Sequence, residues 1–177
     1  MNPVVRYAVA GLVLSGAGLA TWKINEGFTE RPVIPTKGDV PTIGHGSTRY
    51  EDGTPVRMTD PPITRDRAAE LARNLHSEEE VRFRASLPGV LMTQGEYDLY
   101  VDFVGNFGIG NWRQSSMRRH LLAGRYREAC DALLLYRRAG GRDCSLPTSW
   151  GPKGCKGVWT RQLERHAKCV AEQGESK

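Results

Sequence analysis

An uncharged apolar stretch lies near the start of the chain. Residues 7–22 contain no charged side chain, and charged residues return at Lys23. As a helix this stretch would be about 24 Å long, against a hydrocarbon core of about 30 Å in a typical bilayer. More than half of its residues are Gly, Ala, Ser or Thr, which gain little from burial in lipid. The stretch is therefore a short and weakly apolar candidate for a membrane segment.

Three fates of residues 7–22 fit this pattern. Gly18 and Ala20 suit the small-residue positions of a cleavage site, as in a signal peptide that is removed. The stretch could instead be a permanent anchor, or an uncleaved anchor weak enough to leave the bilayer. Arg6 and the N-terminal amine precede it, which weakly favours a cytoplasmic N-terminus. Each of the three fates exports the rest of the chain.

The pattern after the apolar stretch predicts a small β region. Pro32, Pro35 and Pro41 exclude a regular helix between residues 26 and 48. The sequence VPTIGHGST, residues 40–48, alternates enough for a short strand, and Asp52-Gly53 is a typical hairpin turn. We therefore expect a β-hairpin region over about residues 40–58.

Helical spacing of apolar residues dominates the remainder of the chain. The predicted N-terminal signals are Thr64, a capping box of Thr93 and Glu96, and Ser115 or Ser116. The third of these helices stops at Gly124, the next is expected over residues 126–141, and a last one over residues 160–170. The predicted fold class is α+β, a mostly helical body with a small β-hairpin region.

The composition of the chain limits the classes of binding partner and cofactor to be expected. The chain has 177 residues, enough for one domain with a modest core, and a formal net charge of +5. This charge favours anionic partners, but the basic residues are spread along the chain, which argues against nucleic acid. The sequence lacks a Gly-rich phosphate loop and the GxSxG and HExxH motifs. We expect no metal, no organic cofactor and a monomer.

The four cysteines lie in the last third of the chain. Four cysteines allow three pairings, and an exported protein is expected to form disulfides. We favour Cys144–Cys155, which closes the loop CSLPTSWGPKGC, together with Cys130–Cys169. A zinc site is the alternative, but the spacing lacks a CxxC pair and a close pair of histidines.

Glu26 is the first candidate for chemistry. A hairpin that folds back after it would bring Asp39 and Thr42 close to it. Two carboxyl groups that flank a glycosidic bond are what glycoside cleavage needs, and a buried acid keeps the proton that it donates. Of the four histidines, His45 is the strongest candidate for a site role because it lies within the Gly-rich strand.

Three stretches together resemble the phage-type lysozymes, which are the muramidases of phage endolysins. They are EG…TIGHGST from residue 26, YVDFVGNFGIGNWRQSSMRRHLLAGRYREAC, and AGGRDC…GCKGVWTRQLERHAKC. The resemblance covers about residues 26–169. It implies a lysozyme-like fold and hydrolysis of the β-1,4 bond between N-acetylmuramic acid and N-acetylglucosamine in peptidoglycan, which lyses the host cell.

The resemblance also implies the catalytic residues. Glu26 matches the general acid of the family, and Thr42 matches its threonine. The acidic residue of the family usually lies six positions before that threonine, where this chain has Thr36. Asp39 is the only acid between Glu30 and Thr42, so we expect it to take the second carboxylate role. The last helix also departs from the family pattern, with Gln162 in place of its second arginine.

Within this family, residues 1–24 resemble a signal-anchor-release segment, and residues 25–177 would form the catalytic domain. The resemblance implies export without cleavage, a tethered inactive form in the host inner membrane, and release into the periplasm. A holin or pinholin that collapses the membrane potential would be the functional partner. Activation by thiol exchange is not expected, because the segment contains no cysteine.

Two other functions remain open from the sequence, and a third, a basic membrane-active lysin that acts through its terminal helices, is permitted by the charge but disfavoured as the main activity by the globular body. A lytic transglycosylase would use Glu26 alone and produce anhydromuramic ends. A non-catalytic, membrane-tethered wall-binding module would not depend on Glu26.

Overall fold

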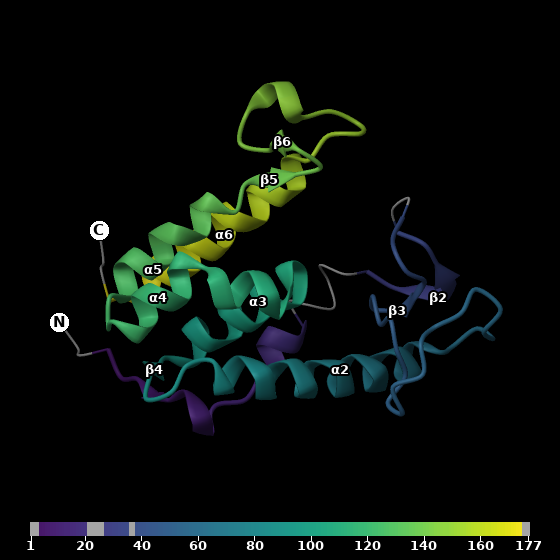
Figure 1. Cartoon of the computed structure of the whole chain (residues 1–177), viewed down its shortest axis with the longest axis horizontal. Helices are drawn as coiled ribbons and strands as arrows, with labels where there is room; N and C mark the ends of the chain where they lie inside the picture. The colour runs from purple at the N-terminus through teal and green to yellow at the C-terminus, as the bar shows by residue number, and fades with distance from the viewer. Residues whose placement is uncertain (1–3, 21–26, 36–37, 175–177) are drawn as a thin grey trace. The chain divides into compact units, whose positions relative to one another are not determined.

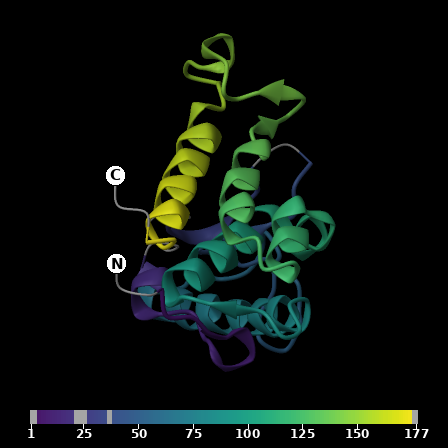
Figure 2. The same ribbon diagram turned by 90° about the vertical axis from the view of Figure 1, so that its left-hand side faces the viewer.

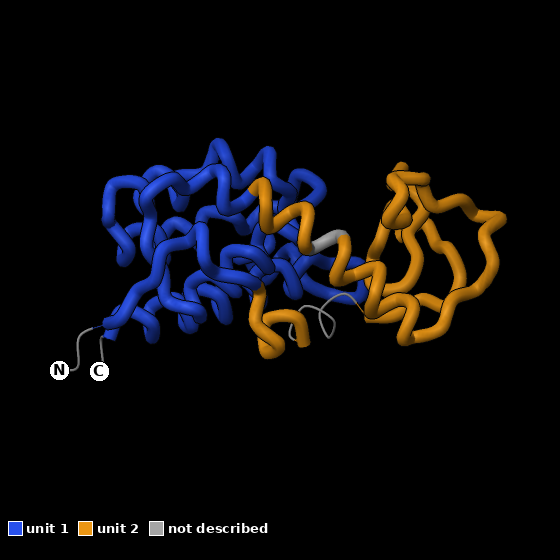
Figure 3. The backbone as a smooth tube through the Cα atoms, turned by 90° about the horizontal axis from the view of Figure 1, so that it is seen from below, with its two compact units in different colours: residues 1–13, 83–177 blue, residues 14–82 orange. Residues whose placement is uncertain are grey.

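The computed structural model describes residues 4–20, 27–35 and 38–174. The backbone falls into two compact units, which Figure 3 colours separately. Unit 1 consists of Met1–Val13 and Phe83–Lys177, and unit 2 of Leu14–Arg82. This division places the start of the chain with its C-terminal part. The proposed boundary between residues 24 and 25 stays a prediction, because it lies outside the described residues.

Unit 2 contains the β region and most of helix α2 (Arg65–Ala85). Strand β2 (Thr29–Val33) pairs antiparallel with β3 (Thr42–Gly44), in a register that sets Thr29 opposite Gly44. The β region was predicted to begin at about residue 40, and this start was wrong, because β2, the partner strand of β3, already begins at Thr29. Pro32 excludes a regular helix but is accepted in β2, because a two-stranded sheet has free edges where a residue without an N–H group fits.

The second part of the β region follows the prediction. An isolated bridge joins Arg49 to Pro55 across the Asp52-Gly53 turn. Gly53 has a φ of 81°, and the Thr54 N–H donates to Asp52 Oδ1 at 2.8 Å. The turn is thus built from a glycine in the left-handed region and an aspartate that bonds its own backbone.

A small core joins the β region to α2. Ile43, Val56 and Leu71 are buried together, with Tyr50 and Ile63 packed against them. Gly44 makes the approach possible: a Cβ atom there would lie 2.9 Å from Ala68 Cβ. Any side chain at this position would push the strand away from the helix.

Unit 1 is helical and has an aromatic core. Its helices are α3 (Gln94–Gln114), α4 (Ser116–Leu122), α5 (Tyr126–Ala132) and α6 (Lys156–Ala171), with the 3-10 turn η2 (Leu133–Leu135) after α5. Figures 1 and 2 show α5 and α6 side by side. Trp112 is fully buried among Phe83, Tyr100 and Phe103, and its indole N–H donates to Ser86 Oγ at 2.8 Å.

The three predicted N-terminal signals are confirmed, whereas the last helix begins at Lys156, four residues before the expected start. The Arg67 N–H donates to Thr64 Oγ1 at 3.1 Å, Thr93 and Glu96 form the capping box, and Ser115 caps α4. The helix expected over 126–141 was wrong at its end. Strands β5 (Arg138–Ala139) and β6 (Arg142–Asp143) occupy that region, because the glycines at 140 and 141 form a hairpin turn with φ of 54° and 76°.

Both predicted disulfides are confirmed. Cys130–Cys169 joins α5 to α6, and Cys144–Cys155 closes the loop between β6 and α6. The turn η3 (Pro147–Ser149) lies within that closed loop. The C-terminal third is therefore held by two covalent links as well as by packing.

The start of the chain is folded onto unit 1. Strand β1 (Tyr7–Ala8) pairs antiparallel with β4 (Leu91–Met92), and the 3-10 turn η1 (Val9–Gly11) follows. Val9 and Leu12 are buried. Within the described ranges, the helices all fall short of the length or apolar character needed to cross a bilayer.

Candidate active site

The β2–β3 hairpin carries two of the three predicted site residues. Asp39 is exposed in the segment that joins the strands, and Thr42 is the first residue of β3. The Thr42 hydroxyl lies 3.4 Å from the Val33 carbonyl oxygen, to which it donates, so it ties the two strands at that end. Glu26 lies outside the described residues. The structure therefore places Asp39 and Thr42 on one hairpin. The distances from these two residues to Glu26 stay a prediction.

His45 fixes the backbone directly after Glu26. A tight turn, closed by two 3.0 Å hydrogen bonds between Ile43 and Ser47, holds the His45 ring in a buried position. Its Nδ1 atom contacts the Gly27 carbonyl oxygen. Because a carbonyl oxygen can only accept, Nδ1 carries the proton of this hydrogen bond. His45 is thus a positioning residue at the start of the hairpin, and its place between two glycines was the signal in the sequence.

The aromatic ring of Phe28 continues this arrangement. It lies 5.8 Å from the His45 ring on one side, and the Arg65 guanidinium lies 4.5 Å from its centroid. An adjacent hollow of about 390 Å³ is lined by Phe28, Glu30, Pro62, Ile63, Thr64 and Arg65. An aromatic ring with a carboxylate and a guanidinium offers both stacking and charged hydrogen bonds to a polar ligand. Neither Phe28 nor Arg65 was predicted, since each lacks a motif of its own.

A second hollow in unit 2, of about 360 Å³, lies between the 49–53 turn and α2. Its Glu51 carboxylate receives two 2.7 Å hydrogen bonds from Arg67, which keep the pKa of Glu51 below its usual value. The Tyr50 hydroxyl donates to Asp60 at 2.9 Å. Burial is the larger cause, and the hydrogen bond to Asp60 the second, of a raised pKa of Tyr50. These groups already satisfy one another, so we assign this hollow a structural role.

A buried polar cluster in unit 1 explains the last helix. Arg165 donates to Asp102 Oδ2 at 2.7 and 2.5 Å, to Asn106 at 2.6 Å and to Gln162 at 2.7 Å. The Gln162 amide in turn donates to the carbonyl oxygens of Leu133 and Tyr136, at 3.2 Å each. Gln162 is fully buried. It therefore joins α6 to the turn after α5, a role for which an amide with both donor and acceptor suits better than an arginine.

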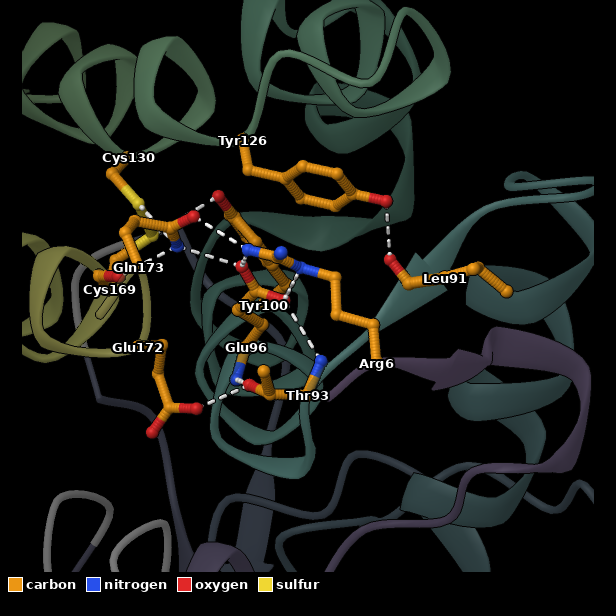
Figure 4. A network of polar contacts seen from close by, with 10 residues as sticks. All are labelled: Arg6, Leu91, Thr93, Glu96, Tyr100, Tyr126, Cys130, Cys169, Glu172 and Gln173. Atoms are coloured by element: carbon orange, nitrogen blue, oxygen red, sulfur yellow. Dashed lines mark hydrogen bonds and ion pairs between the residues drawn. A yellow bond between two sulfur atoms is a disulfide. The ribbon is translucent and has the colours of Figure 1, made fainter. Parts of the chain in front are cut away.

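A second polar cluster binds the beginning of the chain (Figure 4). Arg6 donates through Nε and Nη2 to the two carboxylate oxygens of Glu96, at 3.0 and 2.8 Å. Its Nη2 also donates to Gln173 at 2.6 Å, and the guanidinium lies 3.8 Å from the centroid of the Tyr126 ring. The Glu96 side chain is 1% exposed and also receives the Thr93 N–H at 2.9 Å. Glu96 of the α3 capping box thus also binds the Arg6 guanidinium.

Comparison with protein families gives one match that covers most of the chain. The family described as Phage lysozyme matches residues 23–148. The endolysin of Salmonella phage P22 is 31% identical over 128 residues, which cover 72% of this chain and 85% of that protein. The matched family range contains Glu26, Asp39, Thr42 and His45.

Solved structures confirm the lysozyme-like α+β fold. An endolysin from Escherichia coli O157:H7 phage FAHEc1 superposes with a TM-score of 0.74 at 23% identity, covering 90% of this chain and 94% of that one. The muramidase domain of SpmX from Asticaccaulis excentricus gives a TM-score of 0.68 at 20% identity, covering 93% and 99%. At these identities the likeness concerns the fold.

Proposed function

We propose that this chain, which belongs to the phage lysozyme family and is a glycoside hydrolase of the lysozyme type, cleaves the β-1,4 bond between N-acetylmuramic acid and N-acetylglucosamine. Its substrate is peptidoglycan, on which it acts as a monomer, and the outcome is lysis of the host cell. The observation that carries this proposal is the family match over residues 23–148, which includes Glu26 and the whole β2–β3 hairpin.

In the proposed mechanism, Glu26 protonates the glycosidic oxygen as the bond breaks. Asp39 stabilises the positive charge that develops on the sugar or orients a water molecule, and Thr42 assists it. A general acid typically contributes about 10² to 10⁴ in rate. The bond from His45 to Gly27 supports the proposal, because it holds the backbone next to the acid.

The test is a substitution series read by the clearing of chloroform-treated Gram-negative cells. Glu26→Gln should abolish clearing, and Asp39→Asn should reduce it strongly. Glu164→Gln on the exposed side of α6 is the matched control and should clear normally. A transglycosylase would be inactivated by Glu26→Gln but would keep its activity in Asp39→Asn. Clearing that survives Glu26→Gln would refute the catalytic assignment.

We further propose that residues 1–24 act as a releasable membrane anchor. The segment would span the host inner membrane with its N-terminus in the cytoplasm and enter the periplasm when a holin or pinholin collapses the membrane potential. The folded position of residues 4–13 supports this idea. Val9 and Leu12 are buried in unit 1 and Arg6 is bound by Glu96, contacts that a spanning helix would have to give up. The body therefore offers a competing site for the same residues.

Two glycines allow a clean test of release. A Cβ atom at Gly11 or Gly16 would meet no atom from elsewhere in the chain within 4 Å, so the folded form has space for larger residues at both positions. Two added leucines would favour the membrane by about 3–6 kcal/mol, because their side chains would be exposed in the folded form and buried in lipid. Gly11→Leu/Gly16→Leu should keep the protein in the membrane fraction and delay lysis. Gly11→Ala/Gly16→Ala is the matched control, and equal lysis timing in both would contradict the proposal.

A further inference from the structure

A strongly basic stretch lies near the C-terminal end of the chain. Residues 137–161 contain six basic side chains and one acid, for a net charge of +5. This equals the formal net charge of the whole chain, so the charges of all other residues sum to zero. Residues 113–127, with five arginines and no acid, are a second basic stretch, and acidic residues elsewhere offset its charge.

This stretch forms a projecting, well-defined element of unit 1. It comprises the β5–β6 hairpin, the loop closed by Cys144–Cys155 and the first residues of α6. In both Figure 1 and Figure 2 it extends beyond the N-terminal end of α6. Inside the loop, the Trp150 indole N–H donates to the Cys144 carbonyl at 2.9 Å. A Cβ atom at Gly154 would lie 2.5 Å from the Ser149 carbonyl oxygen, so the backbone there is closely packed. The loop is thus preorganised, which lowers the entropy lost on binding.

The cations of this element face solvent. Its exposed basic residues are Arg137, Arg138, Arg142, Lys153 and Lys156. The single acid, Asp143, is paired with Arg137 at 3.2 Å, which leaves the other cations in clear excess. The element therefore presents a positive surface that can attract a multiply charged anion or an anionic surface.

Apolar side chains are exposed among these cations. Leu135 is 68% exposed, Leu146 51% and Trp150 38%. Lys156 Nζ lies 4.7 Å from the centroid of the Trp150 ring. Because the indole N–H is already bonded and one cation lies against the ring, Trp150 offers apolar contact rather than a hydrogen bond. Exposed leucine and tryptophan have no use against a soluble anion, but they suit the boundary between headgroups and acyl chains.

We propose that the Cys144–Cys155 loop and its flanking cations bind the surface of an anionic phospholipid bilayer. Leu146 and Trp150 enter the headgroup region, and the basic side chains contact lipid phosphates. This binding requires neither glycoside hydrolysis nor the N-terminal segment, so it is independent of the function proposed above. Its effect is to keep the enzyme at a membrane surface, where the adjacent wall is within reach.

The experiment is flotation of the full-length, disulfide-bonded protein with vesicles of phosphatidylglycerol and phosphatidylethanolamine, or of phosphatidylcholine alone. The fraction released by a high-salt wash is scored, because insertion of residues 7–22 would survive that wash while charge-dependent binding would not. Arg138→Gln/Lys153→Gln removes two loop cations. Arg73→Gln/Arg113→Gln removes two exposed cations elsewhere and is the matched control. Thermal unfolding checks that each variant is folded.

We expect salt-releasable binding to the anionic vesicles alone. Each loop cation should contribute about fivefold to partitioning, so the loop double variant should bind about 25-fold more weakly and the control close to normally. Leu146→Ser should lose about fivefold, from a side chain that is half exposed. Normal binding by either loop variant, or an equal loss in the control, would overturn the proposal. Loop-dependent binding to purified peptidoglycan with none to vesicles would also overturn it.

Discussion

Replacing Arg6 with Met should lower the free energy of unfolding by about 3 kcal/mol, because it leaves a buried carboxylate without its cation. Removing one partner of a buried ion pair typically costs about 3–5 kcal/mol. The lower end applies here, since Glu96 keeps hydrogen bonds from the Thr93 N–H and the Gln173 amide. The Arg6 side chain also retains 17% exposure, so its charge is partly hydrated in the folded state. Met preserves the apolar stem of the side chain, which isolates the contribution of the guanidinium.

Thermal unfolding followed by circular dichroism measures this loss. For a chain of this size, about 3 kcal/mol corresponds to a drop in Tm of about 6–12 °C. Arg82→Met is the matched control, because Arg82 pairs with Glu78 at 3.8 Å on an exposed helix surface. It should cost less than about 0.5 kcal/mol.

A double variant separates the charge from the packing. Arg6→Met/Glu96→Gln should recover most of the loss, since the buried charge is removed and glutamine is accepted at this capping-box position. An Arg6→Met protein as stable as Arg82→Met would refute the reasoning that the body binds the N-terminal segment through this pair.

Two further predictions concern unit 2. Gly44→Ala should destabilise the protein by about 2–4 kcal/mol, from left-handed strain and overpacking, because φ is 68° and Ala68 Cβ lies 2.9 Å from the new Cβ. Gly53→Ala has a φ of 81° but open space, so urea unfolding should show only about 1–2 kcal/mol from strain. Burial raises the pKa of Glu79, so ionisation costs stability as pH rises through its ordinary value. Glu79→Gln should therefore unfold at higher temperature than the wild type at neutral pH, with the gain vanishing in acid; a gain that persists in acid would contradict this cause.

The sequence predicted best what local chemistry decides. The capping box at Thr93 and Glu96, the cap at Ser115 and the Asp52-Gly53 turn all depend on residues a few positions apart, and each is confirmed. The disulfides were also predictable, because a short closed loop left only one pairing for the remaining cysteines.

Long-range partners were not predictable in the same way. Helical spacing continued past Ala132, but the two glycines at 140 and 141 turned the chain into a hairpin. The contacts of Arg6 with Glu96 and of Arg165 with Asp102 join residues 90 and 63 positions apart. Nothing in a single sequence specifies such pairs, because each partner alone resembles an ordinary surface charge.

In the candidate site, too, the residues with a local sequence signal were predicted and those that depend on long-range packing were not. Thr42 was predicted from the family motif and Asp39 as the only acid between Glu30 and Thr42, and the structure places both on the β2–β3 hairpin. The contributions of Phe28 and Arg65 depend on how α2 packs against the hairpin within unit 2, and this packing rests on the missing side chain of Gly44.

The most direct test of the proposed function is analysis of the new sugar ends formed when the purified protein digests Gram-negative peptidoglycan. Mass spectrometry after borohydride reduction distinguishes reducing N-acetylmuramic ends from anhydromuramic ends. We predict reducing N-acetylmuramic ends from the wild type and none from a Glu26→Gln variant with an unchanged Tm. Anhydromuramic ends, or reducing ends that persist in Glu26→Gln, would contradict a muramidase that uses Glu26 as its acid.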